Sequence, residues 1–187
     1  MVGLGNPGPE YVWSRHNAGW LVIDSFTSRI GLGEPRVKFG GAFWPASPVE
    51  GENTAFLKPF TYMNLSGTAV LEVSRYYDIV PGDILVVSDD VAIPFGRLRF
   101  RSEGSAGGHK GLVSIIGALG TVEVPRLRIG VGAPPAVINM KDWVLGRFAK
   151  DERDAWPDVD AAAWTALGRW IRGEIGSGYT FQAVSLK

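Results

Sequence analysis

The chain has 187 residues, and its 19 basic and 19 acidic residues give a formal net charge of zero. Hydrophobic residues make up 45% and charged residues 20%, a balance that excludes a disordered chain and predicts one globular domain over residues 1–187. The lack of cysteine excludes disulfides and thiolate catalysis and favours a cytoplasmic location. No apolar run reaches the roughly 18 residues of a membrane span, so no membrane partner is expected.

Helix and strand patterns alternate along the first half of the chain. A helix is expected over residues 17–30, because Trp20, Ile23 and Phe26 recur three or four positions apart. The next expected elements are a strand pair at 41–46 and 54–58, joined by a turn that carries Pro48 and Gly51, and a helix over 66–77. This alternation is typical of α/β proteins.

The second half contains the predicted centre of the sheet. The apolar run at 84–87 predicts a strand buried on both faces, and Ser88, Asp89 and Asp90 follow it. In open α/β sheets, ligands bind beyond the carboxyl ends of such strands. The other expected elements are a strand at 97–101, a loop at 102–108, a helix at 110–119, a strand at 126–131 and a helix at 151–172. We therefore expect a twisted, mixed and mostly parallel sheet wrapped by helices.

Two glycine-rich segments resemble nucleotide-binding motifs only superficially. Residues 3–8 match the dinucleotide pattern G-x-G-x-x-G, but Pro7 and Pro9 flank the third glycine, and the acidic residue at the required spacing, Asp24, lies within the first predicted helix. Residues 104–110 lack the Gly-Lys-Ser/Thr ending of a phosphate-binding loop. With two distant histidines and no cysteine, a dedicated metal site is also disfavoured.

A more coherent set of polar residues consists of His16, Asp89 and the amides Asn6, Asn17 and Asn64. A histidine before a helix and a carboxylate after a buried strand could together activate water. The carboxamides could donate hydrogen bonds to a developing oxyanion. The alternative is that His16 caps its helix and that the asparagines bond their own turns. Spacing alone leaves both interpretations open.

Five segments, in this order, resemble bacterial-type peptidyl-tRNA hydrolases. They are VGLGNPGPEY at 2–11, RHNAG at 15–19, KPFTYMNLSG at 58–67, GGHKGL at 107–112 and RLRIGVG at 126–132. The resemblance implies a monomeric α/β enzyme that needs neither cofactor nor metal. It also implies hydrolysis of the ester between a peptide's C-terminus and the 3′ ribose of tRNA, which frees tRNA from peptides dropped by stalled ribosomes.

The resemblance also implies roles for individual residues. His16 would be the base that activates water, Asp89 would orient it, and Asn6 and Asn64 would hold the substrate and polarise its ester carbonyl. Further residues implied to bind substrate are Tyr11, Asn17, Met63, His109 and Lys110, with residues 133–142 as a mobile lid. Lys110 departs from the family pattern, which usually has asparagine after this histidine.

The neutral chain carries a local excess of positive charge. Residues 97–128 hold six basic and two acidic residues, a net charge of +4, although the whole chain is neutral. The resemblance favours Arg99, Arg101 and Arg128 as contacts to phosphates of the tRNA acceptor stem. Lys110 opens its predicted helix at the positive end of the helix dipole, where a phosphate of the 3′ CCA end would compensate it; the alternative is that Lys110 extends into water. A solvated strand face is the alternative for each arginine.

Two other functions remain to be weighed. A non-catalytic RNA-binding relative of the same fold, like those in group II intron splicing in chloroplasts, would bind tRNA or other RNA without cleaving it. A general small-ester hydrolase is disfavoured by the arginine-rich strand and by the lack of a Gly-x-Ser-x-Gly motif.

Overall fold

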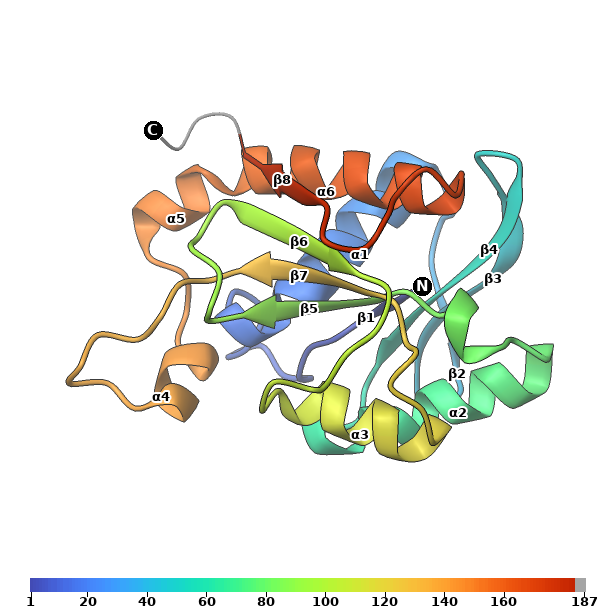
Figure 1. Cartoon of the computed structure of the whole chain (residues 1–187), viewed down its shortest axis with the longest axis horizontal. Helices are drawn as coiled ribbons and strands as arrows, with labels where there is room; N and C mark the ends of the chain where they lie inside the picture. Colours follow the sequence, from blue (N-terminus) through green and yellow to red (C-terminus); the bar gives the residue numbers. More distant parts are fainter. Residues whose placement is uncertain (184–187) are drawn as a thin grey trace.

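The computed structural model describes residues 1–183, which build one mixed β-sheet with helices on both faces (Figure 1). Within these residues the sheet has eight strands in the order β2-β3-β4-β1-β5-β7-β6-β8. The strands are β1 (Val2–Gly3), β2 (Arg36–Lys38), β3 (Gly41–Val49), β4 (Glu52–Pro59), β5 (Val86–Asp90), β6 (Arg97–Arg101), β7 (Arg126–Gly130) and β8 (Thr180–Gln182). The helices are α1 (Ala18–Arg29), α2 (Ser66–Tyr77), α3 (Lys110–Leu119), α4 (Met140–Leu145), α5 (Lys150–Asp154) and α6 (Trp156–Ile171).

The centre of the sheet is parallel and its flanks are antiparallel. Strands β4, β1, β5 and β7 run in the same direction, whereas β2, β3, β6 and β8 join through antiparallel pairs. The prediction of a mixed sheet is confirmed. The expected parallel majority is wrong, because four of the seven strand pairs within residues 1–183 are antiparallel. The expectation came from the pattern of the buried central strand, and that pattern carries no information about the outer strands of the sheet.

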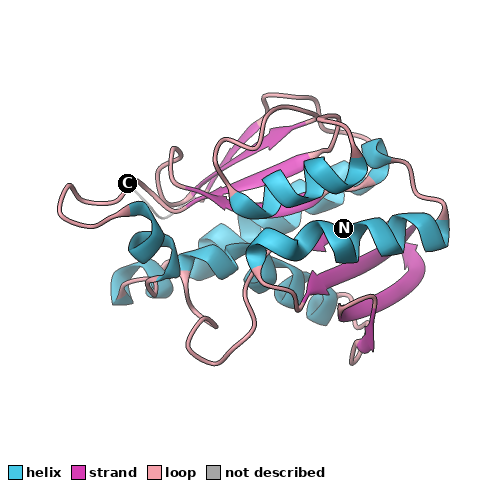
Figure 2. Ribbon diagram, turned by 90° about the horizontal axis from the view of Figure 1, so that it is seen from below, coloured by secondary structure: helices cyan, strands magenta, loops and turns pink. Residues whose placement is uncertain are grey.

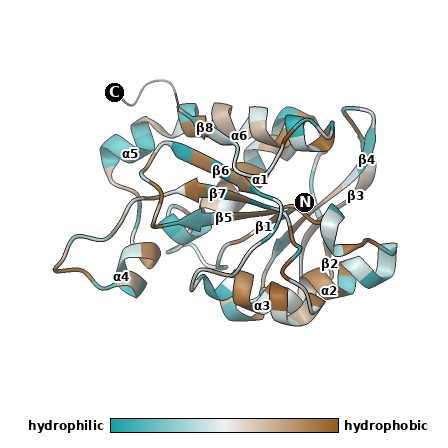
Figure 3. Cartoon of the chain, viewed as in Figure 1, coloured by the Kyte–Doolittle hydropathy of each residue, from teal (hydrophilic) through white to brown (hydrophobic). Residues whose placement is uncertain are grey.

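Two apolar cores lie on opposite faces of the sheet. Helices α1 and α6 cover one face around Ile23, Phe26 and Leu167. Helices α2 and α3 lie side by side across the other face, where they bury Val70 and Ile115 (Figure 2). Figure 3 shows the strongest hydrophobic colouring on α3 and the central strands, while α5 is mostly hydrophilic. Within the described residues, no helix is both long and apolar enough to cross a bilayer.

The glycine-rich start of the chain serves close packing between α1 and the sheet. A Cβ atom at Gly3 would lie 2.5 Å from the carbonyl oxygen of Gly19, and one at Gly19 would lie 2.3 Å from that of Val87. Only glycine allows backbones to approach so closely. In the pattern that resembles a dinucleotide motif, Gly3 and Gly5 therefore serve packing against α1, at Gly19 and the Trp20 ring, whereas Gly8 adopts a positive φ of 123°.

Several boundaries differ from the sequence-based expectations. Strand β5 begins at Val86 and ends at Asp90, so Asp89 lies inside the strand instead of after it. The final helix is divided at Ala155 into α5 and α6, and Pro157 occupies the first turn of α6. Pro48 lies within β3, while the hairpin turn falls on Glu50 and Gly51, both with positive φ angles. The short elements β2, α4 and β8 were not predicted.

Candidate active site

A cavity of about 790 Å³ lies where the parallel strands β1, β4 and β5 end. Because carboxyl ends of parallel strands meet at the same edge, segments far apart in sequence converge there. The loop after β1 contributes Asn6 and Tyr11, the segment after β4 contributes Met63 and Asn64, and β5 contributes Asp89. The turn before α1 and the start of α3 add His16, His109 and Lys110.

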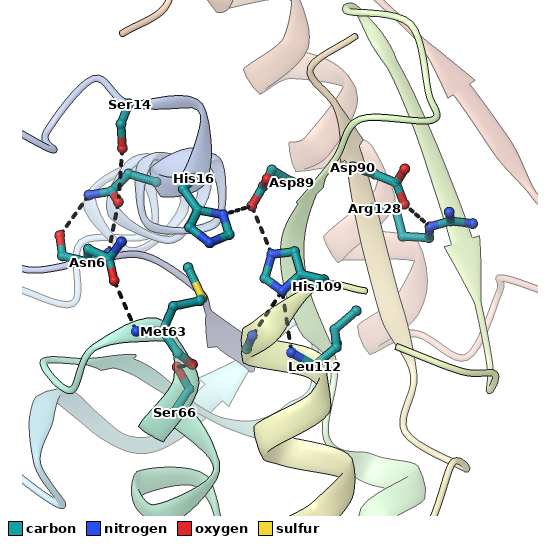
Figure 4. A network of polar contacts seen from close by, with 12 residues as sticks. Asn6, Ser14, His16, Met63, Ser66, Asp89, Asp90, His109, Leu112 and Arg128 are labelled. Atoms are coloured by element: carbon teal, nitrogen blue, oxygen red, sulfur yellow. Dashed lines mark hydrogen bonds and ion pairs between the residues drawn. The ribbon is translucent and has the colours of Figure 1, made fainter. Parts of the chain in front are cut away.

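Both histidines of the chain bond to a single oxygen of Asp89. Nδ1 of His16 lies 2.8 Å from Asp89 Oδ1, and Nε2 of His109 lies 2.9 Å from the same atom. Figure 4 shows the two rings approaching the carboxylate from different elements; the ring centroids are 4.8 Å apart. The carboxylate is only 4% exposed, so water does not compete strongly for these bonds.

The surrounding bonds define which nitrogen of each histidine carries a proton. Nδ1 of His109 accepts the amide N–H groups of Gly111 and Leu112 at 3.2 and 3.4 Å, which caps α3. His109 must therefore donate to Asp89 through Nε2–H. His16 donates through Nδ1–H, because the carboxylate can only accept, and in the neutral ring this leaves Nε2 as the acceptor.

The Asp89 carboxylate is held in its charged form. Burial by itself disfavours the charge, but the attraction and hydrogen bonds of His16 and His109 outweigh it and lower the pKa of Asp89 well below its usual range. At neutral pH this side chain is an acceptor that fixes the ring of His16.

Asn6 presents a fixed donor to the cavity, and Asn17 holds it in place. Oδ1 of Asn6 accepts the amide of Met63 at 3.0 Å, so its NH₂ group is the part left to donate to a ligand (Figure 4). Asn17 is 1% exposed, accepts the amide of Asn6 at 2.8 Å and donates to its carbonyl at 3.1 Å. A substrate-binding role would require Asn17 to line the cavity. The structure does not place it there, because its amide is used to support the Asn6 loop.

The wall of the cavity toward residues 133–142 is formed mainly by α4. Met140, Lys141, Val144 and Leu145 line the cavity, whereas residues 133–139 do not. The predicted lid thus overlaps the wall only at its last residues. Sequence reasoning missed α4, because six residues without a buried face give little periodic signal.

One buried side chain attaches α4 to the turn that carries His16. The guanidinium carbon of Arg15 lies 3.6 Å from the ring centroid of Trp143, Nη2 lies 2.7 Å from Glu152 Oε2, and Nη1 donates to the carbonyl of Arg147 at 3.0 Å. The cation–π stack and the ion pair fix this wall relative to the histidine. Sequence reasoning placed Arg15 in a family segment but assigned it no role.

A basic wall lies opposite, on β6 and β7. The register places Arg99 across from Arg128 and Arg101 across from Arg126. Arg101, Arg126 and Arg128 line the cavity, whereas Arg99 lies outside its lining. Arg128 forms an ion pair with Asp90 (Figure 4), a partner that sequence reasoning did not identify.

Metal binding would conflict with these hydrogen bonds. One ligand atom each of His16, Asp89 and His109 lies within 4.8 Å of the others, a spacing compatible with a metal ion. Both histidine nitrogens nearest Asp89 carry the protons that bond it, however. An ion here would have to displace both protons and break both bonds.

The fold and site define an α/β protein whose histidine–carboxylate pair lies in a cavity at the carboxyl ends of its parallel strands. The chain belongs to the peptidyl-tRNA hydrolase family, whose sequence model matches residues 1–183. This confirms the family resemblance of the five sequence segments.

Individual relatives agree with this assignment over most of the chain. A peptidyl-tRNA hydrolase of Symbiobacterium thermophilum is 49% identical over 91% of this chain and 87% of its own length. One of Geobacillus kaustophilus is 47% identical over 89% and 87%. A crystal structure of a peptidyl-tRNA hydrolase with n-propanol has a TM-score of 0.86 and 33% identity, covering 92% of this chain and 88% of that one. A point mutant of the Acinetobacter baumannii enzyme has a TM-score of 0.86 and 34% identity, with the same coverage.

Proposed function

We propose that the protein hydrolyses the ester between the C-terminal carboxyl of a peptide and the 3′ ribose of tRNA. The observation that carries this proposal is the His16–Asp89 pair, which lies in a cavity between a fixed amide donor and a basic wall. Family membership supports the same substrate.

The chemical step needs only groups of this chain and one water molecule. Nε2 of His16 takes a proton from water, whose oxygen attacks the ester carbonyl carbon. The Asp89 carboxylate stabilises the imidazolium that forms, and the NH₂ group of Asn6 donates to the developing oxyanion. The intermediate then expels the ribose 3′ oxygen, which takes the proton back from His16. The products are the free peptide and tRNA.

The two sides of the cavity suit the two parts of this substrate. We place the peptide against Tyr11, Met63 and the apolar residues of α4, with Asn64 as a further amide for its backbone. We place the 3′ CCA end near Lys110, because a lysine can bind a phosphate as a point charge. The acceptor-stem phosphates would follow Arg101 and Arg128, with Arg99 extending the same strand face outward.

We infer a monomeric enzyme from the resemblance to this family. Because its substrate is tRNA, we place its action in the cytoplasm. The non-catalytic RNA-binding alternative is not favoured, since the relatives are named as hydrolases and the residues for the chemical step are all present.

The direct test compares N-acetyl-aminoacyl-tRNA with free aminoacyl-tRNA. The proposal expects rapid ester loss from the N-acetylated substrate only, because its amide mimics a peptide. Binding of both without cleavage would select the non-catalytic alternative. Equal cleavage of both tRNA substrates, together with cleavage of small esters, would indicate a general esterase.

A further inference from the structure

Arg126 is a buried arginine that the proposed mechanism leaves unused. It lies in β7 with 2% of its surface exposed, and within residues 1–183 no carboxylate oxygen lies within 4.0 Å of its guanidinium. Burial and the nearby charge of Arg128 lower the pKa of Arg126, while the charge of Glu103 opposes this shift. Burying a guanidinium without a counter-ion is unfavourable, so its hydrogen bonds must compensate.

The guanidinium of Arg126 bonds the chain on both sides of α3. Its Nη1 donates to the carbonyls of Gly104 and Ser105 at 2.7 and 2.8 Å, in the loop before the helix. Its Nη2 and Nε donate to Val122 and Val124 at 3.1 and 3.0 Å, in the segment after the helix. A planar guanidinium can satisfy four separate carbonyls in this way, whereas an ammonium group cannot.

The loop held by Arg126 leads directly to the histidine–carboxylate pair. Gly107 and Gly108 have φ angles of 55° and 80°, so the loop contains two residues of high conformational freedom. It ends at His109, whose amide donates to Ala106 at 3.0 Å and whose ring bonds Asp89. A flexible loop can hold His109 at one distance from Asp89 only if something else fixes it.

We propose that Arg126 is a positioning residue, which fixes the loop at residues 104–108 so that His109 keeps its bond to Asp89 and thereby orients His16. Its neighbours Arg101 and Arg128 also line the cavity, but the guanidinium of Arg126 is already bonded to the backbone. The kinetic consequences of this proposal rest on the proposed function; the structural consequence does not.

The structural consequence is testable by NMR of the imidazole groups. The chain has only two histidines, so a sample labelled with ¹⁵N-histidine gives two sets of ring signals. We expect two hydrogen-bonded N–H resonances in the native protein, of which His109→Asn removes one and so assigns it. Arg126→Lys keeps the charge but not the four bonds, and we expect it to shift or broaden the His109 resonance. Arg128→Lys, on the same face two residues away, should leave it unchanged.

Gly104→Ala provides a second variant in case Arg126→Lys does not fold. Gly104 has a φ of 137°, which disfavours an L side chain, and the Cβ added by the substitution would lie 3.9 Å from Nη1 of Arg126. It should therefore disturb the same loop and the same resonance. A folded Arg126→Lys or Gly104→Ala protein with an unchanged His109 resonance would overturn the proposal.

A double-mutant cycle provides the kinetic test. Arg126→Lys is expected to lower kcat about tenfold in the native background and less than about twofold in the His109→Asn background, since the bond it protects is already absent. Equal losses in both backgrounds would show that Arg126 acts independently of His109 and would overturn the proposal. A rise in KM alone, with a flatter salt dependence, would instead make it a phosphate contact. Because the NMR measurement needs no substrate, it separates failure of this proposal from failure of the proposed function.

Discussion

At the scale of single residues, the chemistry converges on Asp89. One carboxylate oxygen accepts hydrogen bonds from both His16 and His109, and each of these bonds stabilises the charged form of the side chain. Burial works against that charge, so the site depends on both partners. The same carboxylate therefore links the proposed catalysis to folding stability.

We predict a pH-dependent stabilisation by Asp89. Its pKa is lower in the folded protein than in the unfolded chain, so the unfolded chain binds this proton more readily. The stabilisation is therefore complete above the ordinary aspartate pKa of about 3.9 and is lost as the pH falls below it. The measurement is the free energy of unfolding of wild type and Asp89→Asn in urea. The difference should be smaller at pH 3 than at pH 5; a constant difference would contradict the assignment.

Lys110 has an unusual place at the first position of α3. A cation there faces the positive end of the helix dipole, which is unfavourable unless an anion is near. We predict that Lys110→Ala weakens peptidyl-tRNA binding most at low salt and lowers kcat less than about tenfold, because His16 and Asp89 remain. Lys110→Asn should keep activity. A deep loss of kcat with unchanged affinity would instead place Lys110 in the chemical step.

At the scale of elements, α3 depends on His109 for its cap as well as for its link to Asp89. We predict that His109→Ala destabilises the fold by about 1 kcal/mol through loss of the cap. His109→Asn should restore the unfolding free energy, since asparagine caps helices well, but it should not restore kcat. Urea unfolding and steady-state kinetics on both variants check this. Full activity in His109→Asn would show that the bond to Asp89 is dispensable.

The arginines of β6 and β7 give a second prediction at this scale. Each phosphate contact that is lost should flatten the salt dependence of tRNA binding by about one unit of slope. We expect this for Arg101→Gln and Arg99→Gln, and a smaller change for Arg128→Gln, because Arg128 is already paired with Asp90. Arg97→Gln, at the exposed start of the same strand, is the control. Unchanged slopes in all three variants would mean a merely solvated face.

Some elements could be predicted from sequence because their signals are local. The bounds of α2, α3 and β6 agree with the predicted ranges, since glycines, a clear helical period or a strict alternation mark them. The final helix was predicted without its break at Ala155, although Pro157 in the first turn of α6 is a local signal for it, because a proline ring cannot follow a preceding helical turn without distortion. The antiparallel flank formed by β6 and β8 depends on pairings between distant segments, which no local pattern reveals.

At the scale of the whole molecule, the site was predictable in part. The motifs pointed to His16, Asp89 and Asn6, and the structure brings these residues to one cavity. The pair of hydrogen bonds from the two histidines to Asp89 could not be predicted, because it requires the end of β5 to face the start of α3. The roles of Arg15 and Arg126 were also hidden, since their partners are backbone carbonyls and side chains brought together only by the fold.

The central claim is that His16 activates water for ester hydrolysis. The most direct measurement is the single-turnover rate of N-acetyl-aminoacyl-tRNA hydrolysis by wild type and His16→Ala, with tRNA affinity measured on the same samples. We predict that the rate falls about 10²–10⁴-fold, because general base catalysis is lost, while Kd changes less than about threefold. A His16→Ala protein whose rate stays within about threefold of wild type would contradict the claim.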